Sequence, residues 1–187
     1  MTTTTFLRLV LDYADDLDEA VEIAQSYDMH DSAGTSYHYM VADASGRSAI
    51  FEWVAADDDT DTDGSARELR VTYNDDDAAF GEVEAAADYQ WVTNFVLEPN
   101  YYASDDAKKG LDRYNELYTR LSATDGIVAD ESAAMDVLAA VGRRSWNNDD
   151  ANTITVHSVV YNLTDRVMYW VPNENFDDAS AWITYKL

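Results

Sequence analysis

The chain has 187 residues, of which 37 are Asp or Glu and 12 are Lys or Arg, so its formal net charge at pH 7 is −25 and its pI is about 4.1. This balance excludes the basic surface that nucleic acids and anionic membranes require, and no run of about 18 apolar residues is present that could span a bilayer. Hydrophobic residues still make up 47% of the chain, which predicts a packed core and a single folded domain over residues 1–187.

One helix is predicted near the start of the chain. Residues 6–11 form a short apolar lead before it. Asp15 or Asp16 can cap the helix, and Glu19 follows Asp16 by three residues, as in a capping box. We expect the helix to end near Asp28. Its apolar face has helical spacing and consists of Leu17, Ala20, Val21, Ala24 and Tyr27.

Four strands are predicted next. Residues 36–43 and 48–54 are rich in strand-forming side chains, and turn-forming residues at 44–47 join them, which predicts a hairpin. Residues 68–73 and 90–97 give two further strands.

Two helices are predicted in the second half of the chain. The first covers residues 105–121, with Arg113 beside its apolar stripe of Leu111, Tyr114, Leu117, Tyr118 and Leu121. The second covers residues 131–141, and Gly142 should stop it. Its inward residues are predicted to be Ala134, Leu138 and Val141.

A second hairpin and a last strand complete the expected elements. Residues 153–163 and 166–171 flank a turn at Thr164 and Asp165, and residues 181–187 form the last strand. Together the elements predict an α+β protein with mostly antiparallel sheet.

Metal chemistry is not expected. The loop over residues 59–64 resembles the first half of a calcium loop, but Arg70 stands where the bidentate Glu should be. His30, His38 and His157 lack any metal-ligand spacing, and His38 and His157 fall in predicted strands, where a structural role is favoured. We therefore expect no metal and no cofactor.

The excess of acidic residues suggests a host with a salt-rich cytoplasm. High net charge strains a compact state by self-repulsion. At about 1 M salt the Debye length is only about 3 Å, so that repulsion is largely screened. The start, Met1 followed by four threonines, is neither basic nor apolar enough for a signal peptide, which favours a cytoplasmic location. An acidic protein from an ordinary host is the alternative.

Five segments, taken in chain order, resemble the linear amide C–N hydrolases of the choloylglycine hydrolase and penicillin V acylase family. The most specific is a hairpin with the family's pattern His-x-x-x-x-Asp-x-x-Gly-x-x-x-x-x-Glu, at His38, Asp43, Gly46 and Glu52. The other four are a short helix, a Val-Thr-Asn segment, a helix start and a closing strand, over residues 17–21, 91–95, 111–114 and 156–162.

The resemblance implies an N-terminal-nucleophile (Ntn) hydrolase with an αββα sandwich, here a partial one with mostly antiparallel sheets. It covers the later two-thirds of a typical member. The family's first third carries the nucleophilic Cys and the Arg and Asp around it, and it has no counterpart in this chain, which has no cysteine. We therefore expect residues 1–187 to be the C-terminal part of an Ntn-hydrolase-like fold.

Two catalytic residues are carried over by the resemblance. Asn94 matches the family's Asn whose side-chain amide helps to hold the oxyanion, and Arg113 matches the Arg that faces the nucleophile. Each has a simpler alternative. Asn94 could satisfy backbone groups at a strand end, and Arg113 could pair with a nearby acid on a helix surface.

The missing cysteine leaves three explanations open: a piece of a longer enzyme, one subunit of a composite site, or a degenerate relative. The first two predict part of a hydrolase that cleaves non-peptide linear amide C–N bonds in a small-molecule acyl amide and is inactive alone. The third predicts a ligand- or partner-binding module. Strand edges left open would invite pairing, so we expect a homo-oligomer or a complex with a nucleophile-bearing segment. An unrelated α+β domain is the remaining reading.

Overall fold

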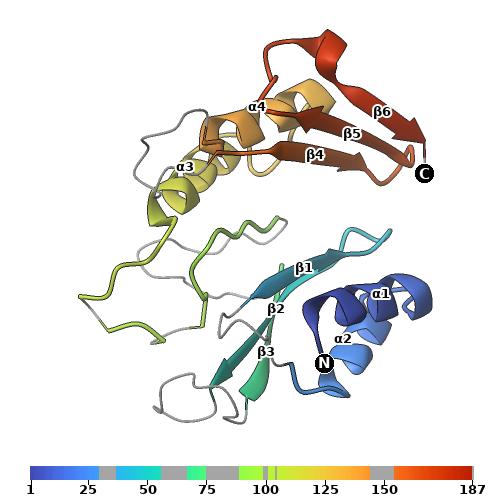
Figure 1. Ribbon diagram of the computed structural model, residues 1–187, viewed down its shortest axis with the longest axis vertical. Coiled ribbons are helices and arrows are strands. Elements are labelled where there is room, and N and C mark those ends of the chain that lie inside the picture. The colour runs from blue at the N-terminus through green and yellow to red at the C-terminus, as the bar shows by residue number, and fades with distance from the viewer. Residues whose placement is uncertain are drawn as a thin grey trace. The chain divides into compact units, whose positions relative to one another are not determined.

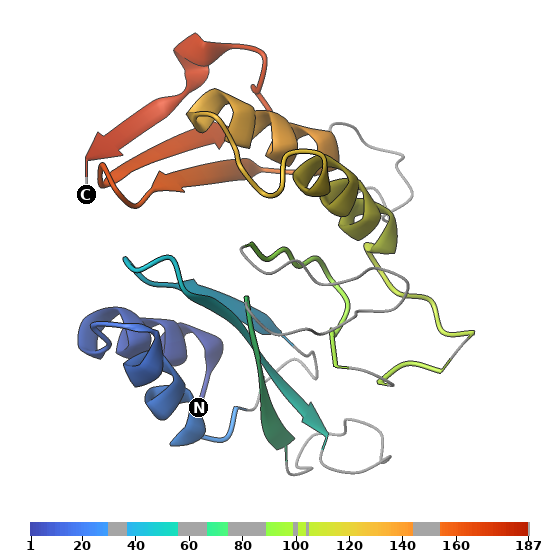
Figure 2. The same cartoon turned by 180° about the vertical axis from the view of Figure 1, so that it is seen from behind.

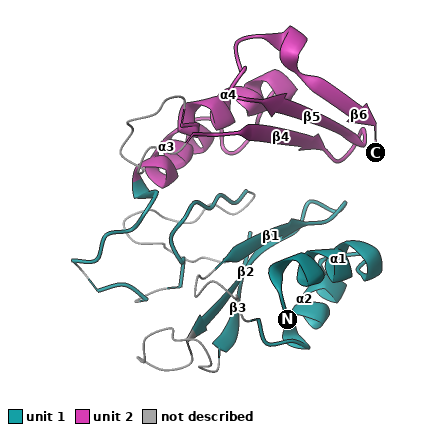
Figure 3. Cartoon of the chain, in the orientation of Figure 1, with its two compact units in different colours: residues 1–111 teal, residues 112–187 magenta. Residues whose placement is uncertain are grey.

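A computed structural model describes residues 1–29, 37–55, 67–74, 89–98, 101–103, 105–143 and 154–186 (Figure 1). The chain divides into two compact units, residues 1–111 and 112–187 (Figure 3), and each is described by itself. Each unit contains helices and a three-stranded antiparallel sheet. The predicted α+β class with antiparallel sheets is therefore confirmed, whereas a single domain over residues 1–187 stays a prediction.

The first unit begins with two helices, α1 (Thr3–Tyr13) and α2 (Leu17–Gln25). The short apolar lead expected over residues 6–11 is part of a helix that was not predicted, because these residues belong to α1. Phe6 and Val10 are four residues apart and share one side of a helix, where Phe6 is fully buried and Val10 packs against the same core.

Helix α2 starts as predicted and ends early. The Asp16 carboxylate accepts a hydrogen bond from the Glu19 amide at 3.0 Å, and the Glu19 carboxylate accepts one from the Asp15 amide at 2.8 Å. This variant of the capping box satisfies two amide donors at the start of the helix. Because the helix ends at Gln25 and not near Asp28, Tyr27 leaves the apolar face and is exposed.

The first sheet has the order β1-β2-β3, with β1 (His38–Ala42), β2 (Ser48–Ala55) and β3 (Arg67–Tyr73). β1 and β2 form the predicted hairpin, with His38 opposite Glu52. Tyr39 and Trp53 point toward the helices, where their rings contact Phe6 edge to face with centroid distances of 5.0 and 5.3 Å. This aromatic cluster is the core of the first unit.

The strand predicted over residues 90–97 is wrong, because these residues run without ladder pairing. Side chains take the place of a neighbouring strand. The Val96 amide donates to the Tyr102 hydroxyl at 3.0 Å, and the Leu97 amide donates to the Glu52 carboxylate. Gln90 ties the start of the segment to β3 through a hydrogen bond from its Nε2 to the Thr72 carbonyl.

The second unit contains α4 (Glu131–Val141), η1 (Ala179–Ala181) and a sheet of β4 (His157–Asn162), β5 (Val167–Pro172) and β6 (Ile183–Lys186) in that order. The predicted hairpin and last strand are confirmed. Seen from both sides, α4 lies along one face of this sheet (Figures 1 and 2). The buried core between them consists of Met135, Val171 and Phe176, with Leu138 packed against it.

Both helices predicted in the second half of the chain exist. α3 (Leu111–Ser122) begins six residues later than expected, because Gly110 has a positive φ of 83° and interrupts the helix before it. In α4, Met135 is buried where Ala134 was predicted to face inward. Gly142 ends α4 as predicted, and its missing Cβ leaves room for the Phe176 ring, whose Cε2 would lie 3.2 Å from such an atom.

Candidate functional site

Asn94 lies in the first unit, exposed on the segment of residues 91–97. Its neighbours along the chain are anchored in the interior, since Trp91, Phe95 and Leu97 are all buried. Asn94 is therefore exposed on a segment that these three buried side chains hold in place. An exposed amide on a fixed backbone is the arrangement that a pre-organised hydrogen-bond donor needs.

Hydrogen bonds fix this segment on both sides of Asn94. Before it, the Thr93 hydroxyl donates to the Gly110 carbonyl at 3.0 Å. After it, the Val96 amide donates to the Tyr102 hydroxyl, which packs beside the Phe95 ring at a centroid distance of 6.5 Å. Burial raises the pKa of Tyr102 above its ordinary value of 10.0.

Glu52 supplies a further, buried anchor. Its side chain is on the central strand β2 and the residue is only 2% exposed. Both carboxylate oxygens accept from the Leu97 amide, at 2.9 and 3.0 Å. His38, the cross-strand partner of Glu52, places its Nδ1 3.3 Å from Oε1. The sequence showed Glu52 only as a motif position, although an acid inside the apolar run from Ala49 to Val54 was a signal of a buried role.

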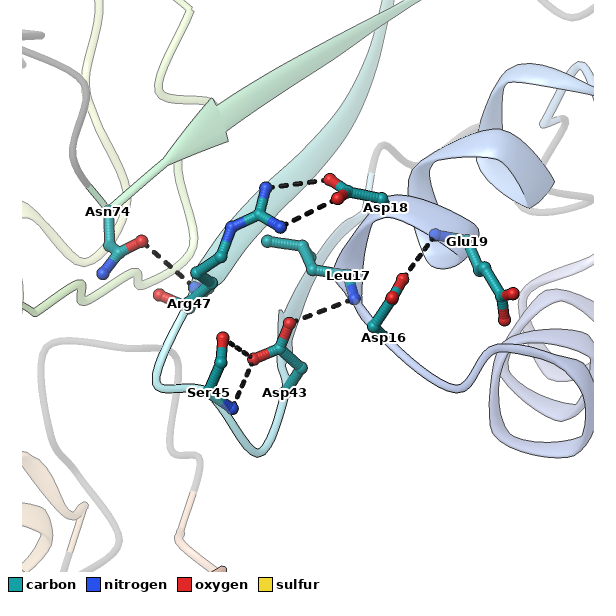
Figure 4. Close-up of polar contacts among 9 residues, drawn as sticks. Asp16, Leu17, Asp18, Glu19, Asp43, Ser45, Arg47 and Asn74 are labelled. Carbon is teal, nitrogen blue, oxygen red and sulfur yellow. Dashed lines mark hydrogen bonds and ion pairs between the residues drawn. The ribbon is translucent and has the colours of Figure 1, made fainter.

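Asp43, the other acid of the hairpin motif, fastens the turn to α2 (Figure 4). Its carboxylate accepts from the Leu17 amide at 3.2 Å and from the Ser45 amide at 2.8 Å. Hydrogen bonds from Ser45 hold the pKa of Asp43 below its ordinary value. Beside it, Arg47 donates two hydrogen bonds to Asp18, at 2.9 and 2.8 Å. Asp43 therefore joins the β1–β2 turn to helix α2.

Arg113 lies on α3 in the second unit and is half-buried. The neighbouring Asp112 carboxylate accepts from Arg143 at 2.9 Å. Burial opposes ionisation of Asp112, but the hydrogen bond from Arg143 and the charge of Arg113 lower its pKa. Asn94 and Arg113 belong to different units, so their meeting in one site stays a prediction.

Two features weighed as possible metal ligands, His30 and the acidic loop over residues 59–64, lie outside the described residues. Within the described part, Arg70 pairs with Glu68 at 2.9 Å and with Glu98 at 3.3 Å. Among the same residues, no three His, Cys, Asp or Glu side chains are grouped as a metal site. His157 lies in β4, with its ring edge to face with Trp170. Over the described ranges, no helix has the length and apolarity needed to cross a membrane.

Comparison with known families identifies the kind of enzyme to which this chain is related. Residues 1–176 match the sequence model of acyl-coenzyme A:6-aminopenicillanic acid acyl-transferase. The chain belongs to that family. The family is Ntn-hydrolase-like, so the resemblance drawn from the hairpin and its companion segments is confirmed at this level, and membership indicates acyl-transfer chemistry. The narrower likeness to choloylglycine hydrolase and penicillin V acylase stays a prediction. No curated protein matches the chain.

Proposed function

We propose that this chain is part of an enzyme that hydrolyses non-peptide linear amide C–N bonds in small acylated molecules. The family match over residues 1–176 carries the proposal, because it covers nearly the whole chain and indicates acyl-transfer chemistry. The exposed, anchored Asn94 supports it from the structure. In a hydrolase of this kind, water is the final acceptor of the acyl group.

The proposed reaction needs a nucleophile that these 187 residues do not contain, since the chain has no cysteine. A thiolate from another segment or chain attacks the amide carbonyl, and Asn94 donates a hydrogen bond to the oxygen as it becomes negative. Such a donor lowers the barrier by about 3–4 kcal/mol. The C–N bond then breaks, and the amine leaves with the proton that the thiol gave up. Water hydrolyses the thioester to the acid and restores the thiol. Arg113 is proposed to stabilise the thiolate.

The partner of this chain follows from the same proposal. Each three-stranded sheet ends in edge strands, β1 and β3 in one unit and β4 and β6 in the other. Open edges favour pairing with further strands. We propose that the working enzyme is a homo-oligomer, or a complex in which a nucleophile-bearing segment completes the site for a small acyl amide.

Substitution of Asn94 tests the proposal in the native assembly. With penicillin V or a conjugated bile salt as substrate, Asn94→Ala should lower kcat about 10²–10³-fold and change KM little, because the lost donor acts mainly in the transition state. Asn115→Ala, which removes another exposed Asn, on α3, is the matched control and should leave kcat unchanged. An unchanged kcat in Asn94→Ala would exclude the proposed oxyanion role.

A second candidate is a catalytically inactive relative that uses the same surface to bind an acyl ligand or a partner chain. The absence of cysteine from the 187 residues favours it. The two candidates differ in the native protein: the enzyme turns over the amide when its complete assembly is isolated, and the binding module does not. Turnover by the purified 187-residue chain alone would contradict both.

A further inference from the structure

We propose that Glu52 is the positioning residue of the Asn94 segment. Its buried carboxylate fixes the backbone at Leu97, three residues after Asn94, and thereby sets the orientation of the Asn94 side-chain amide. The consequence for catalysis rests on the proposed function. The contact itself does not, and the experiments below separate the two.

The burial of Glu52 requires an explanation. A carboxylate removed from water is strongly destabilising unless hydrogen bonds or an opposite charge compensate it. At 2% exposure, Glu52 has lost nearly all contact with solvent. Its two oxygens converge on a single backbone amide, that of Leu97, at 2.9 and 3.0 Å. The protein thus retains a buried carboxyl group at the point where it holds one particular stretch of backbone.

That stretch is held by the side-chain hydrogen bonds of Gln90, Thr93 and Tyr102, but no strand among the described residues pairs with it. Residues 90–97 run beside the sheet without ladder hydrogen bonds, so the amide of Leu97 has no strand neighbour to receive it. Glu52 acts as the missing acceptor. Because a buried amide left unpaired costs about as much as a lost hydrogen bond, the segment is driven to this position on β2.

Glu52 is itself held rigidly. Its strand β2 is paired on both sides, with His38 of β1 and Arg70 of β3 directly opposite Glu52. The His38 ring stands 3.3 Å from the carboxylate and limits its rotation. The paired sheet therefore holds Glu52 in place, Glu52 holds the Leu97 backbone, and the Leu97 backbone restricts the position of Asn94. A donor fixed in advance needs no reorganisation during the reaction, which is the condition for effective oxyanion stabilisation.

Amide hydrogen exchange of the full 187-residue chain tests the contact directly. In the wild type, the Leu97 amide should exchange as slowly as amides of the β1–β2 ladder. Glu52→Met puts an apolar side chain of similar length in place of the Glu and removes the acceptor. Exchange at Leu97 should therefore become at least about 10-fold faster, while the ladder amides change little. Glu68→Gln, at an exposed acid of the same sheet, is the control and should leave Leu97 unchanged.

Two outcomes of this measurement would overturn the proposal. One is wild-type Leu97 exchanging as fast as exposed amides, which needs no variant. The other is unchanged protection of Leu97 in Glu52→Met. If Glu52→Met does not fold, Glu52→Gln replaces it, because the amide keeps one acceptor oxygen and turns a second donor toward Leu97. Leu97 protection should then fall partway, and full protection would again contradict the proposal.

A double-mutant cycle in the native assembly tests the catalytic consequence. Glu52→Gln should lower kcat about 10–100-fold with little change in KM, since a small displacement of a catalytic group has effects of this size. In an Asn94→Ala background the same change should have almost no further effect. An equal loss in both backgrounds would show that Glu52 acts elsewhere. An unchanged kcat in Asn94→Ala alone would instead reject the proposed function, and the exchange measurement would still decide the role of Glu52.

Discussion

Individual carboxylates in this acidic chain differ in what they contact. Asp43 and Glu52 accept hydrogen bonds from backbone amides that lie 26 and 45 residues away in the sequence. A local pattern cannot encode partners at such distances, so the sequence identified both acids as motif positions without showing their contacts. Asn94 was predicted from the sequence by resemblance, and the structure adds that it is exposed on an anchored segment.

Asp43 should make stability depend on pH. Its folded-state pKa is lowered, chiefly by hydrogen bonds from Ser45, below the ordinary 3.8. Its contribution is therefore complete above the unfolded pKa and is lost as the pH falls through the lower folded value. Asp43→Asn should lower the urea midpoint most at pH 6, and the difference from wild type should shrink as the pH falls below 3.8, the ordinary pKa of an Asp.

The control for that experiment is Asp136→Asn, at an exposed position on α4. It should show no comparable dependence on pH. A difference between wild type and Asp43→Asn that stays constant from pH 6 to pH 3 would contradict a role for the charge.

The elements that the sequence predicted well have local signals. The spacing of Asp16 and Glu19 predicts the cap at the start of helix α2, and the turn-forming residues 44–47 predict the β1–β2 hairpin. The failures have physical reasons too. Residues 6–11 were too few to show the helical spacing of α1. Residues 90–97 contain strand-forming side chains, but their backbone amides donate to the side chains of Tyr102 and Glu52 instead of to a neighbouring strand.

The caps themselves should be measurable at the level of the helix. At the start of α4, the Asp130 carboxylate accepts from the Ala133 amide at 2.8 Å. Asp130→Ala should lower the free energy of unfolding by about 1 kcal/mol, because a helix amide loses its acceptor. Asp136→Ala, in the middle of the same helix, removes an acid without a cap and should have no such effect in urea unfolding. Equal values for the two variants would reject the capping role.

As a whole, the chain belongs to a family of acyl-transfer enzymes, yet it has 37 acidic residues and no cysteine. Its two units each carry a three-stranded antiparallel sheet. A salt-rich host, in which a net charge of −25 is screened, stays a prediction from composition. We propose that this chain supplies Asn94 to an amide hydrolase whose thiol lies outside the 187 residues.

The most direct test is the intact mass of the native protein, isolated from its host in high salt, together with that of any chain that co-purifies. We expect a heavier chain or a second chain that bears a cysteine, and iodoacetamide should label that cysteine and abolish amide hydrolysis. A lone species of about 21.0 kDa, the mass of this sequence, would contradict the claim and leave a protein without the family's nucleophile.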